Sequence, residues 1–164
     1  MLGITHIVNT IAITCTPLLF GFEADWNYAF FILACVFGAL LPDIDEPSST
    51  LGKRLPYLAY PIKIFFGHRT ITHNAIVSMI IILIGYMNNY IYLVAFGLGM
   101  FIHIMQDSMT YQGVKGAFFP FQKYYYNFVL LPRVFRFAVG STTEYIIFTL
   151  SCVYILYIAY RVII

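Results

Sequence analysis

Residues 74–106 constrain the fold of this chain more than any other stretch, because they contain no Asp, Glu, Lys or Arg and only one histidine, His103. A short polar interruption, "MNNY", lies in the middle of this apolar run and is typical of a tight turn between two helices. Two apolar helices joined by such a turn form a hairpin that suits the interior of a lipid bilayer. This stretch therefore predicts a membrane protein.

The composition of the whole chain agrees with this interpretation. Hydrophobic residues make up 61% of the 164 residues, charged residues only 10%, and the mean hydropathy is +0.83. Soluble domains contain about 45–50% apolar and about 25% charged residues. We therefore expect a single membrane domain over residues 1–164. The net charge of +2 does not indicate a nucleic-acid partner, and the three cysteines lack the paired spacing of a disulfide framework or a zinc knuckle.

Five apolar runs predict an all-α bundle of about five transmembrane helices. The expected ranges are residues 4–22, 26–41, 72–87, 90–109 and 143–160. The uncharged parts of the second and fifth runs are 16 residues each, or about 24 Å, against a hydrocarbon core of about 30 Å. Polar residues at the helix ends should therefore lie at or slightly below the membrane surface. The first run contains Asn9 and Pro17, which leaves a partly re-entrant course open.

Five helices of alternating direction place most titratable side chains on one face of the membrane. All four histidines and five of the seven acidic residues fall on the face where the chain begins, and only Glu23 and Asp25 fall on the other. Eight of the nine basic residues share the histidine-rich face, and Arg161 alone lies opposite. The positive-inside rule then predicts a multi-pass protein whose histidine-rich face looks into the cytoplasm.

Two acidic motifs on this face are candidate metal ligands. His103 and Asp107 are four residues apart and share one helical face, although a lone histidine can also be a hydrogen-bonded core residue. Asp43 and Asp45 follow Pro42 at the end of the second run, where the helix dipole opposes negative charge. An ordinary solvated helix end is the alternative, but a bound cation would offset these charges.

The sequence "HRTITH" supplies further candidates. His68 and His73 are five residues apart, about 140° around a helix, so they do not share one helical face. We expect Thr70 or Thr72 to cap the third helix, with His73 in its first turn and His68 reaching in from the preceding loop.

Two weaker candidates come from the first and last helices. His6 can join the site from the first helix, or it can be an isolated histidine at the membrane interface. Glu144 follows "GSTT" and can be either a ligand or the acidic residue of a capping box.

A mixed set of imidazoles and carboxylates suits zinc, manganese or iron better than magnesium or calcium. The candidates exceed the needs of one tetrahedral ion, and two ions about 3.5–4 Å apart would use them to activate water and hydrolyse a phosphoester. Asp45 and His73 are the candidates for carrying the proton. Arg69 can make a bidentate contact to a phosphate.

Two aromatic stretches are expected at the membrane surface, where they would contact membrane lipids. Residues 111–140 contain "FFPFQKYYYNFVLLPRVFRF", which fits an interfacial belt that can also guide a lipid toward the metals. The stretch "YLAYPIKIFFG" is expected to be interfacial too. Lys53 and Arg54 in "TLGKRLP" need be no more than positive-inside charges.

With these motifs in view, the chain resembles the YdjM-like family of bacterial inner-membrane proteins, which are described as metal-dependent hydrolases. The resemblance covers an early "TH", "GALLPDIDEPSSTLGKR", "HRTITH", "GMFIHIMQDSMTYQGVKGAFFPF" and "GSTTE". The chain departs from the family pattern at Asn74, where serine is expected, and at "FFPF", where tryptophan often precedes Pro-Phe. The resemblance implies a location in the cell inner membrane and a ligand set of His6, Asp43, Asp45, His68, His73, His103 and Asp107.

The leading hypothesis is a metal-dependent hydrolase, holding zinc or manganese, that cleaves a phosphoester of a lipid or lipid-linked substrate from the cytoplasmic leaflet. A divalent metal transporter or sensor is the alternative, but transporters place their ligands near the bilayer midplane and often contain internal repeats, which this chain does not show. A structural role for the polar cluster is the third hypothesis. The sequence does not indicate an oligomeric state.

Overall fold

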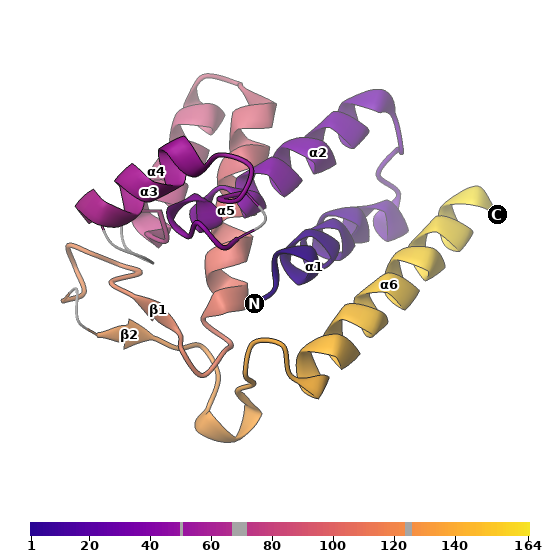
Figure 1. Cartoon of the computed structure of the whole chain (residues 1–164). Helices are drawn as coiled ribbons and strands as arrows, with labels where there is room; N and C mark the ends of the chain where they lie inside the picture. Colours follow the sequence, from indigo (N-terminus) through magenta and orange to yellow (C-terminus); the bar gives the residue numbers. More distant parts are fainter. Residues whose placement is uncertain (50, 67–71, 124–125) are drawn as a thin grey trace.

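The computed structural model describes residues 1–49, 51–66, 72–123 and 126–164, and it is predominantly helical (Figure 1). His68, Arg69 and Thr70, three residues of the sequence prediction, lie outside the described residues. The all-α prediction is confirmed. The helices of the described residues are α1 Gly3–Cys15, α2 Trp26–Leu40, α3 Pro56–Phe66, α4 Ala75–Met87, α5 Ile91–Asp107 and α6 Thr142–Ile163.

Shorter elements connect these helices. Three 3-10 segments are present in the described part of the chain: η1 Thr16–Phe20, η2 Pro42–Asp45 and η3 Arg133–Phe135. The strand β1 Val114–Lys115 pairs antiparallel with β2 Asn127–Phe128 within the predicted interfacial loop. A two-residue hairpin of this kind does not change the fold class.

Each of the five predicted apolar runs contains a helix. Three helical stretches are long and apolar enough to cross a membrane: Gly3–Phe20, Trp26–Asp45 and Thr142–Ile163. The remaining two, α4 and α5, are apolar but shorter. α4 has 13 residues, which corresponds to about 20 Å of helix.

The end of α1 and the start of α2 both coincide with recognisable sequence signals. α1 ends at Cys15, and Pro17 lies in the first turn of η1, which continues the same rod to Phe20. α2 begins after Asp25, whose side chain accepts a hydrogen bond of 2.7 Å from the Tyr28 N–H. This bond, and a second from the Asn27 side chain, lower the pKa of Asp25.

The start of α4 differs from the prediction. Asn74 is the N-cap, and its side-chain oxygen accepts hydrogen bonds from the N–H groups of Ile76 at 2.8 Å and Val77 at 3.3 Å. Asparagine is a stronger N-cap than threonine. The prediction that Thr72 caps this helix and that His73 lies in its first turn is therefore wrong, because both residues precede the helix.

α2, α4 and α5 pack closely because glycines line their contacts. A Cβ on Gly38 of α2 would lie 1.9 Å from the Phe96 carbonyl oxygen of α5, and one on Gly99 of α5 would lie 1.9 Å from the Cys35 carbonyl oxygen of α2. Small residues allow helix backbones to approach in this way inside membranes. α1 packs between α2 and α6 (Figure 1).

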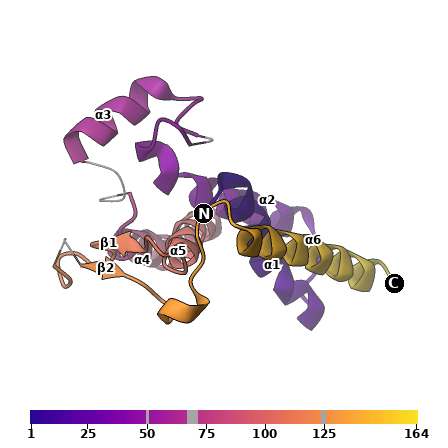
Figure 2. The same ribbon diagram turned by 60° about the horizontal axis from the view of Figure 1, so that its bottom comes forward.

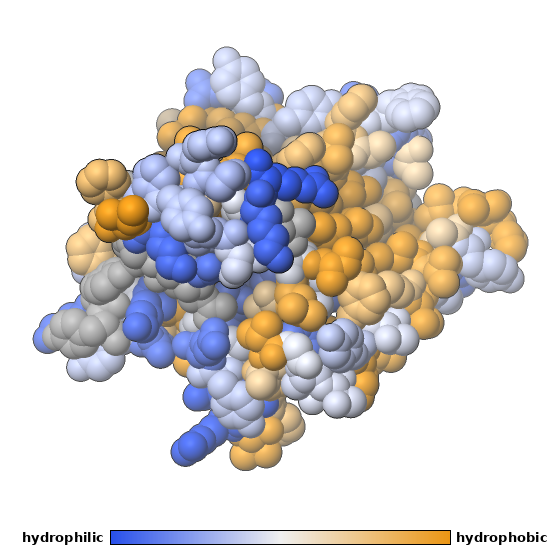
Figure 3. Space-filling model, in the orientation of Figure 1, coloured by the Kyte–Doolittle hydropathy of each residue, from blue (hydrophilic) through white to orange (hydrophobic). Residues whose placement is uncertain are grey.

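α3 was expected as an interfacial stretch, and the structure makes it a helix that stands apart from the others (Figure 2). It packs against η2, and Lys63 pairs with Glu46 at 2.9 Å. Its aromatic residues Tyr57 and Phe65 are exposed. Apolar surface predominates over α1 and α6, whereas hydrophilic residues gather toward α3 and the β1–β2 hairpin (Figure 3). An exposed aromatic helix on the more polar side is consistent with an interfacial position.

Candidate metal centre

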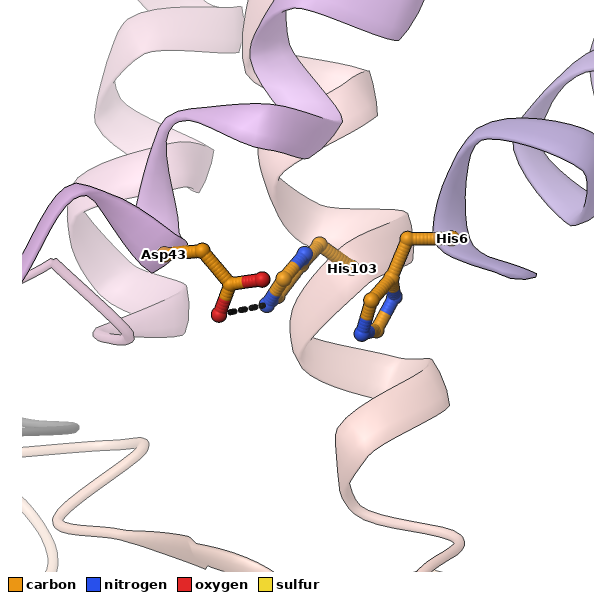
Figure 4. A group of neighbouring side chains, drawn as sticks. All are labelled: His6, Asp43 and His103. Carbon is orange, nitrogen blue, oxygen red and sulfur yellow. Dashed lines mark ion pairs between the residues drawn. The ribbon is translucent and has the colours of Figure 1, made fainter. Parts of the chain in front are cut away.

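Four separate segments contribute to one group of buried side chains, which we call the His/Asp cluster. It contains residues from α1, from η2, from the segment before α4, and from the end of α5. Four of its five side chains are almost completely buried, and only Asp43 is partly exposed, at 17%. Figure 4 shows three of the members. The His/Asp cluster consists of His6, Asp43, His73, His103 and Asp107.

The ring nitrogens of the cluster face carboxylate oxygens at 3.3–3.9 Å. His103 Nε2 lies 3.6 Å from Asp43 Oδ1 and 3.9 Å from Asp107 Oδ2 (Figure 4 shows the first contact). His73 Nε2 lies 3.7 Å from Asp107 Oδ2. Most of these distances are too long for hydrogen bonds. Ligands held at about 2.0–2.2 Å in tetrahedral geometry are about 3.3–3.6 Å apart, so the spacing fits atoms that share one ion.

Two groups of three donors lie close together among the described residues. The first is His6, Asp43 and His103, and the second is His73, His103 and Asp107; within each group the donor atoms lie within 4.8 Å of one another. His103 belongs to both groups. The five side chains therefore surround one centre and do not form two independent sites.

Hydrogen bonds at Nδ1 fix the orientation of two of the histidines. His103 Nδ1 lies 2.6 Å from the carbonyl oxygen of Ala39, and His6 Nδ1 lies 2.8 Å from Oε1 of Gln106. Since both partners are acceptors, Nδ1 must carry the hydrogen in each ring. We infer that Nε2 then has its lone pair available toward the carboxylates, which is the tautomer that a metal requires.

His73 is oriented through a hydroxyl group. Thr72 Oγ1 donates to Asp45 Oδ2 at 2.5 Å and lies 3.1 Å from His73 Nδ1. Because the single hydroxyl hydrogen is used on the carboxylate, Thr72 can only accept from the imidazole. His73 therefore shares the tautomer of His6 and His103.

The chemistry of these donors fits a divalent cation. His103 Nε2 is buried and makes no hydrogen bond to any described residue. A buried polar atom without a partner and a buried carboxylate both cost free energy unless they are satisfied. Asp107 already attracts a positive group, because the terminal ammonium of Met1 contacts its Oδ1. A divalent ion would satisfy the nitrogens and the carboxylates together.

Two predicted ligands lie in other positions. Asp45 is fully buried beside Nδ1 of His73, at 3.6 Å, on the side of the ring away from Nε2. Glu144 accepts from the backbone N–H groups of Leu2 at 2.6 Å and Gly140 at 2.7 Å. Ser141 is the N-cap of α6, and Glu144 is its third residue. The Ser141 hydroxyl accepts from the Glu144 N–H at 3.4 Å, as in a capping box, but the Glu144 carboxylate does not bond the Ser141 N–H. Glu144 therefore holds the N–H groups of Leu2 and Gly140 outside the cluster, and Asp45 has a supporting position beside His73.

Sequence reasoning missed three groups that support the cluster. Gln106 lies three residues after His103 on the same helix, so helical spacing could have identified it. Thr72 was considered only as a cap. The Ala39 carbonyl gives no signal in the sequence, since it is available only because α2 ends at Leu40 and leaves its last carbonyls without helical partners.

An apolar cavity of about 730 Å³ lies between α1, α2 and α5. Its lining extends along α5 from Ile91 to Gln106, and it includes Ile13 and Tyr28 from the two other helices. Gln106 is also the hydrogen-bond partner of His6. The cavity therefore adjoins the His/Asp cluster at one end.

The whole chain, residues 1–164, matches the protein family described as YdjM inner membrane protein. One relative is the uncharacterized protein YvsG of Bacillus subtilis (strain 168), which is 32% identical over 121 residues that cover 72% of this chain and 73% of the relative.

The inner membrane protein YdjM of Escherichia coli (strain K12) and that of Shigella flexneri are each 34% identical over 106 residues. These matches cover 60% of this chain and 52% of each relative, so the match extends over about half the length of the two proteins. No solved structure matches the chain.

Proposed function

Since the chain belongs to the YdjM family of inner membrane proteins, as its motifs indicated, we propose that it is a membrane-embedded, metal-dependent hydrolase of a phosphoester. The observation that carries the proposal is the His/Asp cluster. Three imidazoles with the same tautomer and two carboxylates converge in a buried position. A purely structural cluster would not need three Nε2 atoms directed at carboxylates over distances longer than hydrogen bonds.

Zinc or manganese is the ion that this donor set suits best. His103 has one Nε2 lone pair and belongs to both donor groups, so the described residues support one ion. A second ion would need further ligands, for which His68 is the sequence candidate. When bound, the metal would acidify a water molecule and polarise the phosphoryl oxygen.

The residues in and around the cluster have two further roles, substrate access and proton transfer. Asp43 is the most exposed member and lies where a substrate can reach it. Hydrogen bonds through Thr72 connect His73 of the cluster to the buried carboxylate of Asp45, which can accept a proton. The same hydrogen bonds also hold the His73 ring in place.

The apolar cavity supports a lipid or lipid-linked substrate. It is lined along most of α5, which has 17 residues, or about 26 Å. We propose that the hydrocarbon chain of the substrate occupies it, because its Gln106 end lies beside the cluster and its lining is almost entirely apolar. Cavities of this size are typical of sites for small molecules.

Substitution of the cluster tests the hydrolase. His103→Ala and Asp107→Asn should each insert into the membrane, lose bound metal, and lose hydrolysis of a panel of phospholipids and generic phosphodiesters. Their effects on rate should be strongly non-additive, because either loss disables the whole unit. Arg161→Gln, a change of one charge on the opposite face, is the control, because Arg161 is exposed and lines neither the cluster nor the apolar cavity, and it should retain metal and activity. Metal content, thermal stability in detergent and turnover are measured for each protein.

The outcomes separate the functions. Full metal content and activity in Asp107→Asn would contradict the proposal. Stoichiometric metal without turnover of any ester in the unmodified protein would favour the alternative of a metal transporter or sensor.

A bulky residue in the cavity tests the lipid chain. Ile13 lines the cavity and is 51% exposed, whereas Ile80 of α4 is 50% exposed and is not part of the lining. Ile13→Trp should lower turnover of a long-chain phospholipid but not that of a short soluble phosphodiester, and Ile80→Trp should change neither. Equal rates for Ile13→Trp on both substrates would exclude the cavity as the hydrocarbon site.

A further inference from the structure

A second cavity, of about 630 Å³, opens beside Asp43 and differs in character from the apolar one. Its lining includes hydroxyl groups from Ser48 and Ser49 and two cations, Lys53 and Arg54. Asp43 is at once a member of the His/Asp cluster and part of this lining. The cavity therefore brings two positively charged side chains into the same space as one member of the candidate metal centre.

Hydrogen bonds of Ser49 connect the backbone near Lys53 and Arg54 to the backbone of Asp43. Ser49 Oγ donates to the carbonyl oxygen of Asp43 at 2.7 Å and accepts from the Gly52 N–H at 2.9 Å. The Lys53 N–H donates to the Ser49 carbonyl at 3.1 Å. A Cβ on Gly52 would lie 2.0 Å from the Glu46 carbonyl oxygen, so the turn is tight. Lys53 and Arg54 are thus tied to the backbone of a cluster residue.

The other wall of this cavity is the N-terminal end of α1, where Leu2 and Gly3 line it. A helix N-terminus carries partial positive charge, but the Leu2 N–H already donates to the Glu144 carboxylate at 2.6 Å. The charge that attracts a further anion therefore comes from Lys53 and Arg54. Glu46, the acidic residue of the lining besides Asp43, already pairs with Lys63 at 2.9 Å.

We propose that this cavity binds the phosphate-bearing headgroup of the substrate, with Lys53 and Arg54 contacting the phosphate oxygens beside Asp43. The identity of the reaction rests on the proposed function, but the cavity is a binding site in its own right. Arginine matches phosphate with two parallel N–H donors, and lysine adds a point charge. These two residues then have a role beyond the positive-inside charges that the sequence indicated.

Inorganic phosphate is the probe for this site. The full-length, zinc-loaded protein in detergent is titrated with phosphate by calorimetry, and metal content is measured in parallel. The double variant Lys53→Ala, Arg54→Ala should bind phosphate at least about tenfold more weakly, because the loss of even one hydrogen bond to a charged group has about this effect. Its metal content should not change. Arg54→Lys should show an intermediate loss, because lysine keeps the charge without the bidentate geometry.

A control of equal charge separates a specific site from general electrostatics. Lys115 and Arg133 are exposed and do not line the cavity. The double variant Lys115→Ala, Arg133→Ala should bind phosphate as the unmodified protein does. Equal affinity in the two double variants, or an unmodified protein that binds no phosphate, would overturn the proposal.

Lipid discs identify the source of the phosphate. Discs of phosphatidic acid in phosphatidylcholine are compared with soluble glycerol phosphate as competitors of phosphate binding. Stronger competition by the discs assigns the cavity to a lipid headgroup, and stronger competition by glycerol phosphate assigns it to a soluble phosphoester.

The proposal and the hydrolase can fail separately. Phosphate binding that depends on Lys53 and Arg54, in a protein that cleaves no ester, would refute the hydrolase and keep the cavity assignment. Hydrolysis with an unchanged KM in the Lys53→Ala, Arg54→Ala variant would refute the cavity assignment and keep the hydrolase.

Discussion

Three imidazole rings of the His/Asp cluster are oriented through their Nδ1 atoms, each by a different kind of acceptor. His103 uses a backbone carbonyl, His6 a side-chain amide, and His73 the hydroxyl group of Thr72. Partners of this kind fix the tautomer and the direction of a ligand, and their loss typically costs metal affinity. The supporting residues therefore control the site as much as the donors do.

Thr72→Val tests this control. Valine has the shape of threonine without its hydroxyl, so Asp45 loses a donor and His73 loses an acceptor. We expect zinc affinity to fall by about 10–100-fold, as for other partners of metal-binding histidines. Thr72→Ser should restore the affinity, because it keeps the hydroxyl. Competition with a chelator of known affinity measures the change, and an unaltered affinity in Thr72→Val would mean that the hydroxyl has no part in the site.

The residue types and their spacing predicted much of the candidate site but not its support. The structure brings together His6, Asp43, His73, His103 and Asp107, all of which were chosen from helix ends or from spacing along one helix. Their ligand role is still a prediction. The supporting Ala39 carbonyl could not be predicted, because it depends on the residue at which α2 ends.

At the scale of elements, the glycine contact between α2 and α5 sets the geometry of the cluster. Gly99 lies one turn before His103, and the bond from His103 Nδ1 to the Ala39 carbonyl crosses the same interface at 2.6 Å. Side chains larger than hydrogen would push the two helices apart. The distance between Asp43 and His103 therefore depends on residues that contribute no donor atom.

Gly99→Ala measures this dependence. The added Cβ would lie 1.9 Å from the Cys35 carbonyl oxygen, a backbone atom that moves only with its helix. We expect a loss of stability of about 1–3 kcal/mol or more, together with weaker metal binding. Gly97→Ala should cost less, because its nearest atom, at 2.8 Å, is a side-chain carbon of Ile82. Thermal unfolding in detergent and metal titration compare the two, and equal losses would contradict this account.

The helices themselves were easier to predict than their ends. Apolar runs and turn signals located α1, α2, α4, α5 and α6, because a bilayer requires long apolar segments. The start of α4 was mistaken, since Thr72 and Asn74 are both acceptable caps and only the tertiary structure decides between them. α3 was predicted only as an interfacial stretch, and Pro61 inside it is a residue that disfavours a helix interior.

At the scale of the whole molecule, the membrane topology depends on whether the hairpin formed by α4 and α5 crosses the bilayer completely. α4 has 13 residues and α5 has 17, about 20 Å and 26 Å, both less than the hydrocarbon core of about 30 Å. The hairpin nevertheless reaches the level at which α2 begins, because the Tyr92 hydroxyl donates to Asn27 Oδ1 at 3.3 Å. Exposed Trp26, Tyr86 and Tyr90 near these ends are the residues expected at a membrane interface.

Labelling with a membrane-impermeant thiol reagent tests whether the hairpin crosses. On the five-span sequence prediction, eight of the nine basic residues fall on the histidine-rich face, so the positive-inside rule predicts that this face is cytoplasmic. Asn88→Cys, in the hairpin turn, should therefore react in intact cells, and Tyr126→Cys, in the loop that contains the strands, should react only after permeabilisation. Both positions are exposed, whereas the native Cys15, Cys35 and Cys152 are buried or half-buried, so the parent protein is the control.

If the hairpin is instead re-entrant, Asn88→Cys will resist the external reagent. If the orientation is reversed, Tyr126→Cys will be the residue that reacts from outside, and the phosphate cavity would then open away from the cytoplasm.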